Sequence, residues 1–127
     1  LIVARHTENM KKSQKKNNFP AETRFLFFED NMWTCWKCGR NHANCGHHIF
    51  GRGKEEGCEK SALNFAPLAN MECHLPNHGW LMTDEGKKEM LEKTIAHLSS
   101  IEYTLTEIDN QFLEKYGLEI YKLRIKL

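Results

Sequence analysis

The chain has no long apolar run. Its 127 residues contain no stretch that approaches the roughly 20 apolar residues needed by a membrane-spanning helix. They also contain no apolar core of the kind found in a secretory signal peptide. We therefore expect a cytoplasmic protein that does not bind membranes. The length predicts one domain, with little room for a second.

The chain also lacks an excess of positive or negative charge. The sequence has 18 Lys and Arg against 17 Asp and Glu, so the net charge says little about a nucleic-acid partner. A basic run at residues 11–16 is more often a solvated arm than a DNA contact. Arg52 and Lys54 follow closely after the middle histidines. We expect them to contact DNA phosphates, because a guanidinium group matches phosphate oxygens, although Arg52 also fits a plain surface turn.

Three segments of different composition divide the chain. Residues 1–20 form a basic arm with little apolar surface. Residues 21–82 begin with aromatic side chains that can pack on a neighbouring layer, and they contain all five cysteines. Their many glycines and cysteines predict short strands and loops rather than long helices. Residues 83–127 are expected to be a helical extension of the same domain.

The helical extension shows start and stop signals. Thr83 has the properties of an N-cap, because acidic residues and then apolar side chains at helical spacing follow it. Thr104 and Glu107 have the spacing of a capping box, which predicts a second helix that ends near Gly117. The tail, residues 118–127, fits either a last helix or an edge strand. With the short strands of the middle segment, these helices predict an α+β protein.

The cysteines predict a metal site. Cys35 and Cys38 form a Cys-x-x-Cys pair, and no βαβ pattern surrounds them that would favour a thioredoxin-like redox motif. A structural zinc ion takes four thiolate or imidazole ligands in a tetrahedron. Cys73 is the natural third ligand, and free buried thiols without zinc are the alternative. Three residues are candidates for the fourth zinc ligand: Cys58, Cys45 and His42. We favour Cys58.

Four histidines occur in two pairs. His47 and His48 are adjacent, so on an extended strand their side chains point to opposite faces. His74 and His78 are four residues apart and would share one face of a helix, where they could bind a single ion. Pro76 lies between them, and proline is tolerated only in the first turn of a helix. A helix therefore begins near His74, or the pair lies on a turn and His78 is the better ligand.

These residues resemble a known motif. His47-His48, Asn64 and the pair His74 and His78 resemble the HNH nucleases, whose core is the ββα-metal fold. The likeness covers residues 33–80 and includes a Cys-x-x-Cys-Gly opening and a His-His-Ile-x-Gly-Arg core, as in short phage and bacterial members. It implies a small, treble-clef-like ββα-metal core between a helical N-terminal arm and C-terminal helices.

The resemblance also implies roles for single residues. His48 would be the general base that takes a proton from water. His47, His74 and His78 would bind one divalent ion (Mg²⁺, Mn²⁺, Ni²⁺ or Zn²⁺) that stabilises charge on the scissile phosphate. Asn64 would not touch the substrate, because its amide would fix the loop that orients His48. The expected partner is DNA.

A non-catalytic zinc-binding module that binds nucleic acid or a protein is the competing hypothesis. Such a module needs the cysteines but has no use for His48 beside a metal ligand, or for Asn64. A zincin-type hydrolase is disfavoured, because no His-Glu-x-x-His motif occurs. The sequence also shows no recognition helix that would read DNA bases. The C-terminal helices are candidates for a homodimer or protein-partner surface.

Overall fold

The computed structural model describes residues 19–29, 32–40, 42–51 and 57–126. The basic run at residues 11–16, Arg52 and Lys54 lie outside the described residues. The elements follow one another in this order: α3 (Ala21–Phe25), β1 (Phe28–Glu29), β2 (Met32–Trp33), β3 (Cys45–His48), η1 (Cys58–Lys60), η2 (Ala62–Asn64), β4 (Phe65–Leu68), η3 (Asn70–His74), α4 (His78–Leu81), α5 (Asp84–Ser100), α6 (Glu107–Lys115), η4 (Glu119–Tyr121) and α7 (Lys122–Lys126).

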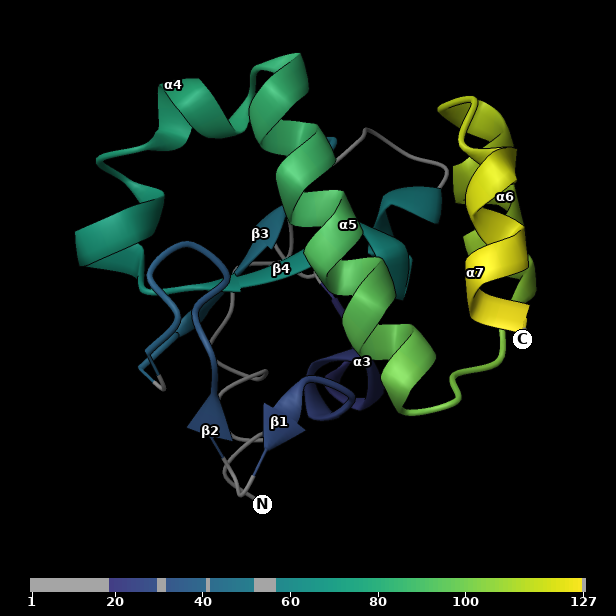
Figure 1. Cartoon of the computed structure of the whole chain (residues 1–127), viewed down its shortest axis with the longest axis horizontal. Helices are drawn as coiled ribbons and strands as arrows, with labels where there is room; N and C mark the ends of the chain where they lie inside the picture. Colours follow the sequence, from purple (N-terminus) through teal and green to yellow (C-terminus); the bar gives the residue numbers. More distant parts are fainter. Residues whose placement is uncertain (1–18, 30–31, 41, 52–56, 127) are drawn as a thin grey trace.

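Strands β3 and β4 pair in antiparallel fashion and carry the residues of most interest (Figure 1). In their register His47 lies opposite Ala66, and His48 lies opposite Phe65. Because side chains alternate along a strand, the two histidines point to opposite faces of this small sheet. A second pair, β1 and β2, is only two residues long on each side. The α+β class is confirmed, and the glycine-rich segment forms short strands as predicted.

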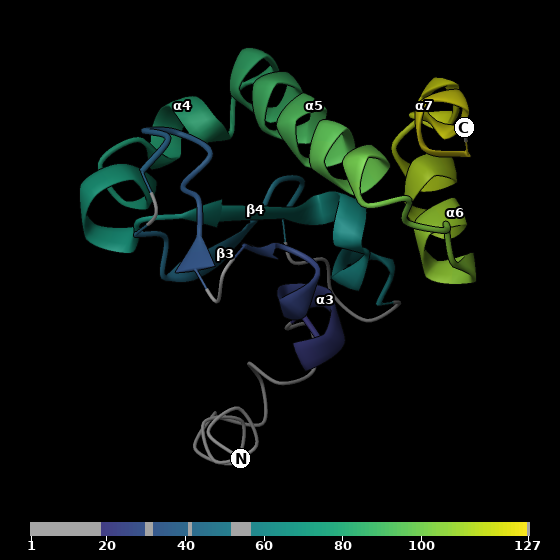
Figure 2. The ribbon, with the colours of Figure 1, turned by 60° about the horizontal axis from the view of Figure 1, so that its bottom comes forward.

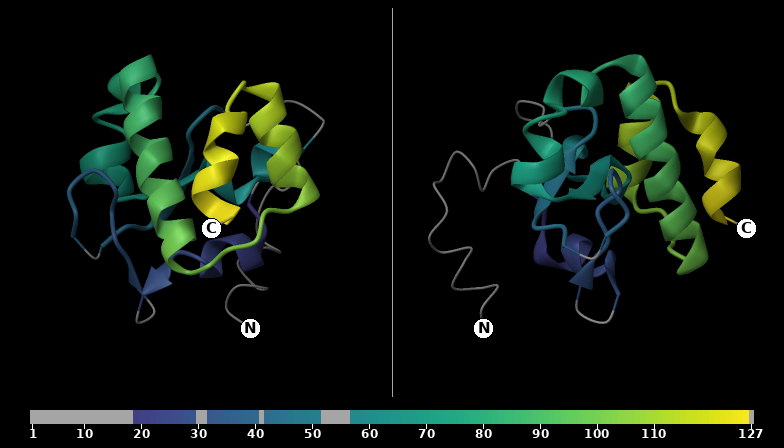
Figure 3. Two further views of the ribbon diagram at one scale, coloured as in Figure 1. Left: turned by 45° about the vertical axis from the view of Figure 1, so that its right-hand side comes forward. Right: turned by 60° about the vertical axis from the view of Figure 1, so that its left-hand side comes forward.

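Helices lie on both sides of the β3–β4 sheet. Figure 2 shows α5 along one side and α3 on the other. Figure 3 shows α6 and α7 next to each other beside α5, and α7 packs on α5 while α6 contacts η1. The core lies between these layers and includes the fully buried side chains of Phe27, Phe65, Leu91, Ile95 and Phe112. Among the helices described, none has the length and apolarity to span a membrane.

Helix α5 matches its prediction closely. The hydroxyl of its N-cap, Thr83, accepts a hydrogen bond from the backbone N–H of Gly86 at 3.1 Å. Such a cap satisfies a donor that would otherwise lack a partner in the first turn. The apolar side chains at helical spacing, including Met90, Leu91 and Leu98, are buried. The helix therefore presents one continuous apolar face to the sheet.

The capping box of the next helix is not where the sequence placed it. Thr106, not Thr104, caps α6: its hydroxyl accepts from Asp109 N–H at 3.3 Å, and the Asp109 carboxylate accepts from Thr106 N–H at 2.8 Å. Ser61 also donates to Asp109 at 2.6 Å, which joins the first turn of α6 to the N-cap of η2. The helix ends just before Gly117, whose φ is +67°. The tail continues as a short helix, α7, and not as a strand.

A glycine in the first turn of α5 offers a test of this packing. Replacing a helical glycine by alanine normally stabilises a helix by about 0.5–1 kcal/mol. At Gly86 an added Cβ would overlap the Trp80 carbonyl oxygen and lie 2.9 Å from Leu81 Cα, and backbone atoms cannot move aside easily. We expect Gly86→Ala to lower the free energy of unfolding in urea by about 1–3 kcal/mol.

Gly79 is the matched control for this substitution. It also lies in a helix, α4, but an added Cβ there would meet nothing within 4 Å. Gly79→Ala should therefore leave the stability unchanged or raise it slightly. Equal midpoints in urea for the two variants would contradict the close approach of α4 to α5.

Candidate metal centres

Three histidines from separate elements come together at one end of β3. His47 is on the strand, His74 ends η3, and His78 begins α4. His47 Nδ1 lies 3.1 Å from His74 Nε2, and the ring centroid of His78 lies 6.1 Å from that of His47 and 5.7 Å from that of His74. The turn that contains Pro76 separates two short helical segments, so the pair does not share one helix. Both histidines nevertheless face His47.

The environment keeps the His47 imidazole neutral. Its side chain is only 4% exposed. Burial, together with the neighbouring His74 and His78 rings, lowers the pKa of His47 to about 3. Burial and His78 also lower the pKa of His74. Neutral imidazoles offer the lone pairs that a divalent metal ion requires.

One nitrogen of this cluster has an unmet hydrogen-bonding capacity. Among the described residues, His47 Nε2 is the one buried side-chain nitrogen or oxygen without a hydrogen-bond partner. Buried polar atoms normally have a partner, so this nitrogen is a second candidate donor of the His47 ring, beside Nδ1, which faces His74 Nε2. Imidazole donors suit a first-row divalent ion such as Zn²⁺ or Ni²⁺. The ligand atoms of the three histidines nevertheless lie farther apart than those of Cys35, Cys38 and His42, the one group among the described residues whose ligand atoms all lie within 4.8 Å of one another.

The sequence analysis missed one residue of this cluster. Asn70 Oδ1 lies 2.9 Å from His74 Nδ1, so it can accept that N–H and leave His74 Nε2 with its lone pair toward His47. The i, i+4 spacing of the two residues on a helical turn was the available signal. Cys45 Sγ also lies 3.4 Å from His74 Nδ1, which places Cys45 beside the histidines.

His48 lies on the other face of the strand. Its ring stacks on Phe19 with centroids 4.1 Å apart and an interplanar angle of 19°, and Phe19 also packs edge-on against Phe65. Only 7% of the His48 side chain is exposed. The structure thus separates the two adjacent imidazoles, as the strand period predicts, and holds the His48 ring in an aromatic setting.

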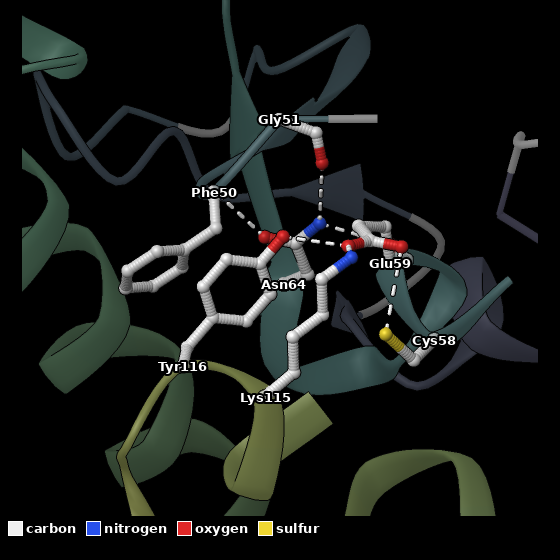
Figure 4. Close-up of polar contacts among 7 residues, drawn as sticks. All are labelled: Phe50, Gly51, Cys58, Glu59, Asn64, Lys115 and Tyr116. Atoms are coloured by element: carbon white, nitrogen blue, oxygen red, sulfur yellow. Dashed lines mark hydrogen bonds and ion pairs between the residues drawn. The ribbon is translucent and has the colours of Figure 1, made fainter. Parts of the chain in front are cut away.

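The side chain of Asn64 is fully buried and forms hydrogen bonds with the backbone of neighbouring segments (Figure 4). Its Oδ1 accepts the N–H of Phe50 at 2.7 Å. Its Nδ2 donates to the carbonyl oxygens of Gly51 at 3.1 Å and of Glu59 at 2.9 Å. The first two bonds hold the turn that directly follows His48.

A second cluster combines cysteine and histidine. The ligand atoms of Cys35, Cys38 and His42 all lie within 4.8 Å of one another, and Cys38 Sγ is 2.9 Å from His42 Nε2. A backbone hydrogen bond at Arg40 and the contact with His42 lower the pKa of the Cys38 thiol to about 6. Burial and hydrogen bonding with the Cys35 and Cys38 thiols raise the pKa of Cys73 to about 12, so Cys73 lies against both. These four residues could bind one metal ion.

Cys58, the favoured fourth ligand, lies elsewhere. Gly57, with φ +86°, leads the chain into η1, where Cys58 Sγ is 3.5 Å from Glu59 Oε1. It lines a pocket with residues of α6, including Lys115, and not with the other cysteines. The expectation for Cys58 is therefore corrected. His42, one of the alternatives, takes its place, because a tight turn of the chain brings it back over Cys38.

The chain was also compared with known protein families, proteins and structures. No protein-family model, curated protein or solved structure matches the chain. The functional argument consequently rests on the geometry of the two clusters and of Asn64.

The cysteine cluster makes a prediction about metal content. We expect the purified protein to bind zinc through this cluster, and Cys73→Ser or His42→Ala to bind about one equivalent less by elemental analysis. Cys58→Ser is the matched control and should keep the wild-type content, because Cys58 lies beside α6. A loss of zinc in Cys58→Ser, with no loss in His42→Ala, would contradict the assignment of His42.

The histidine cluster makes a prediction about pH. In the metal-free protein His47 stays neutral down to about pH 3, whereas an unfolded histidine takes up a proton near pH 6.5. Between these values the unfolded state binds more protons, so stability falls as the pH falls, by up to ~1.4 kcal/mol per pH unit for one group. In urea unfolding of chelator-treated protein, His47→Gln should show a shallower loss below pH 6.5. Identical slopes for wild type and variant would contradict the burial of a neutral His47.

Proposed function

We propose that the protein is a metal-dependent HNH endonuclease that hydrolyses phosphodiester bonds of DNA. The observation that carries the proposal is the meeting of His47, His74 and His78 at the end of β3, with a neutral, buried imidazole at its centre. The order of β3, β4 and the helical segments that follow also agrees with the ββα-metal core implied by the resemblance.

Each residue of the cluster has a role in the proposal. His47, His74 and His78 would hold a divalent ion, and Asn70 would orient His74 through its Nδ1. When bound, such an ion supplies positive charge to the scissile phosphate and to the departing oxygen. Three ligands from three elements would leave positions open for substrate and water, as in catalytic sites and unlike closed structural ones.

His48 is the proposed general base. One of its ring nitrogens would accept the proton from the attacking water, which an unperturbed imidazole can do near neutral pH. Asn64 holds the turn after His48 and so limits how far the ring can swing. Phe19 covers the ring in the structure, so the proposal requires the Phe19 side chain to move aside when water and DNA enter.

The cysteine cluster has a structural role in the proposal. A zinc ion bound by Cys35, Cys38, His42 and Cys73 would join the loop after β2 to η3, which ends in His74. It would thereby support a ligand of the second site. A zinc-binding module without catalysis would account for the cysteine cluster alone, but it would leave the histidine cluster and the buried Asn64 amide without a function.

Plasmid cleavage tests the proposal. Purified protein with Mg²⁺, Mn²⁺, Ni²⁺ or Zn²⁺ should nick or cut plasmid DNA. His48→Ala should lose at least about a hundredfold in rate while keeping the metal content of wild type, because it removes the base and no ligand. His78→Ala should lose both cutting and about one equivalent of metal.

His97→Gln serves as the matched control. His97 stacks on Phe27 and bonds to the Leu26 carbonyl oxygen, and it belongs to neither proposed ligand set, so its variant should cut DNA at nearly the wild-type rate. Cutting by His48→Ala at the wild-type rate would show that the base is wrongly assigned. A full complement of two ions with no cutting under any of the four metals would favour the binding-module hypothesis.

A further inference from the structure

Helix α6 and its C-cap residue, Tyr116, contact both chain segments that Asn64 joins. On one side the Phe50 ring packs against Phe112 and Tyr116, with centroids 5.6 Å and 4.9 Å apart. On the other side Glu59, whose main-chain carbonyl accepts from Asn64 Nδ2, directs its carboxylate toward α6 (Figure 4). The position of Asn64 therefore depends on a helix that lies more than 40 residues away in the sequence.

Glu59 makes the closest of these contacts. Its side chain is 1% exposed, and Oε2 accepts hydrogen bonds from Lys115 Nζ at 2.5 Å and from Tyr116 Oη at 2.6 Å. Burial by itself would raise the pKa of this carboxyl, but the bonds from Lys115 and Tyr116 outweigh it and hold the pKa below the ordinary value. The carboxylate is thus charged, buried and dependent on its partners.

A second buried carboxylate also holds the segment that contains Glu59 and Asn64. Asp109 of α6 accepts from Ser61 Oγ at 2.6 Å and from Tyr103 Oη at 2.5 Å. Ser61 Oγ in turn accepts the N–H of Leu63, next to Asn64. The stretch from residue 59 to residue 64 is therefore held to α6 at two points, both through charge-assisted hydrogen bonds.

We infer that Glu59 is a positioning residue of the proposed nuclease: its pairing with Lys115 and Tyr116 sets the place of the Asn64 amide and, through Phe50 N–H, of the turn that follows His48. The inference rests on the proposed function for its catalytic consequence. The hydrogen-bonded chain from Lys115 to Phe50 stands on the structure alone. In this arrangement α6 is part of the catalytic unit.

Single-turnover cleavage at saturating DNA is the first test. Glu59→Gln removes the charge and keeps the size, and Lys115→Met leaves the buried carboxylate without its cation. We expect each to cut about tenfold to a hundredfold more slowly, since a small misplacement of a catalytic group costs that much. The KM for DNA and the metal content should stay at wild-type values, and Lys115→Arg should restore most of the rate. The control is Glu92→Gln, which removes an exposed pair with Arg124 and should cut normally.

Amide hydrogen exchange is the second test, and it does not need activity. The Phe50 N–H should exchange at least about tenfold faster in Lys115→Met than in wild type, whereas the amides of α5 should keep their protection. If Glu59→Gln fails to fold, Lys115→Met decides, because the Lys115 side chain is 41% exposed and its loss opens no core cavity. Wild-type cutting and wild-type Phe50 exchange in a folded Lys115→Met would overturn the inference.

The two tests separate the inference from the proposed function. Wild-type protein that cuts no DNA with any of the four metals would refute the nuclease proposal. Faster Phe50 exchange in Lys115→Met would then still support the coupling between α6 and the Asn64 turn. Slow cutting by Lys115→Met together with a raised KM or lost metal would instead mean a general loss of structure, which counts against a positioning role.

Discussion

The buried amide of Asn64 is the interaction on which the rest of the site depends. It joins the turn after β3 to the segment before β4 through bonds to Phe50, Gly51 and Glu59. A two-stranded sheet four residues long has few backbone hydrogen bonds of its own. The Asn64 side chain adds hydrogen bonds between the two segments at the end of this sheet. Loss of one partner would leave a buried donor or acceptor unsatisfied, at a cost of about 1–3 kcal/mol.

Local patterns in the sequence account for a large part of what the structure shows. The alternation of side chains along a strand predicts that His47 and His48 diverge, and they do. The cap at Thr83 and the apolar spacing that follows it predict where helix α5 begins and which of its side chains are buried. The four-residue spacing of His74 and His78 predicted one shared helix face, whereas the structure brings their ring centroids to 5.7 Å from two separate elements, η3 and α4.

Features set by distant contacts could not be predicted in this way. The choice of His42 over Cys58 depends on a tight turn after the cysteine pair and on how η1 packs against α6, neither of which a ligand count reveals. The predicted start of α6 was two positions off because Thr104 with Glu107 and Thr106 with Asp109 both have capping-box spacing. The structure uses the second pair, and its Asp109 also accepts from Ser61, 48 residues earlier in the chain. In both cases the sequence offered more than one local candidate, and the folded chain is needed to choose between them.

The hydrogen bonds between α6 and residues 59–64 limit where the chain can be cut into fragments that keep the site. Composition changes after residue 82, where the cysteine-rich segment is followed by the helical extension of the same domain. A fragment cut there would keep the Glu59 carboxylate and lose its cation, and it would strip the aromatic cover from Phe50. The smallest fragment that keeps these contacts therefore includes α6. Residues 83–126 are part of the same folded unit as the site.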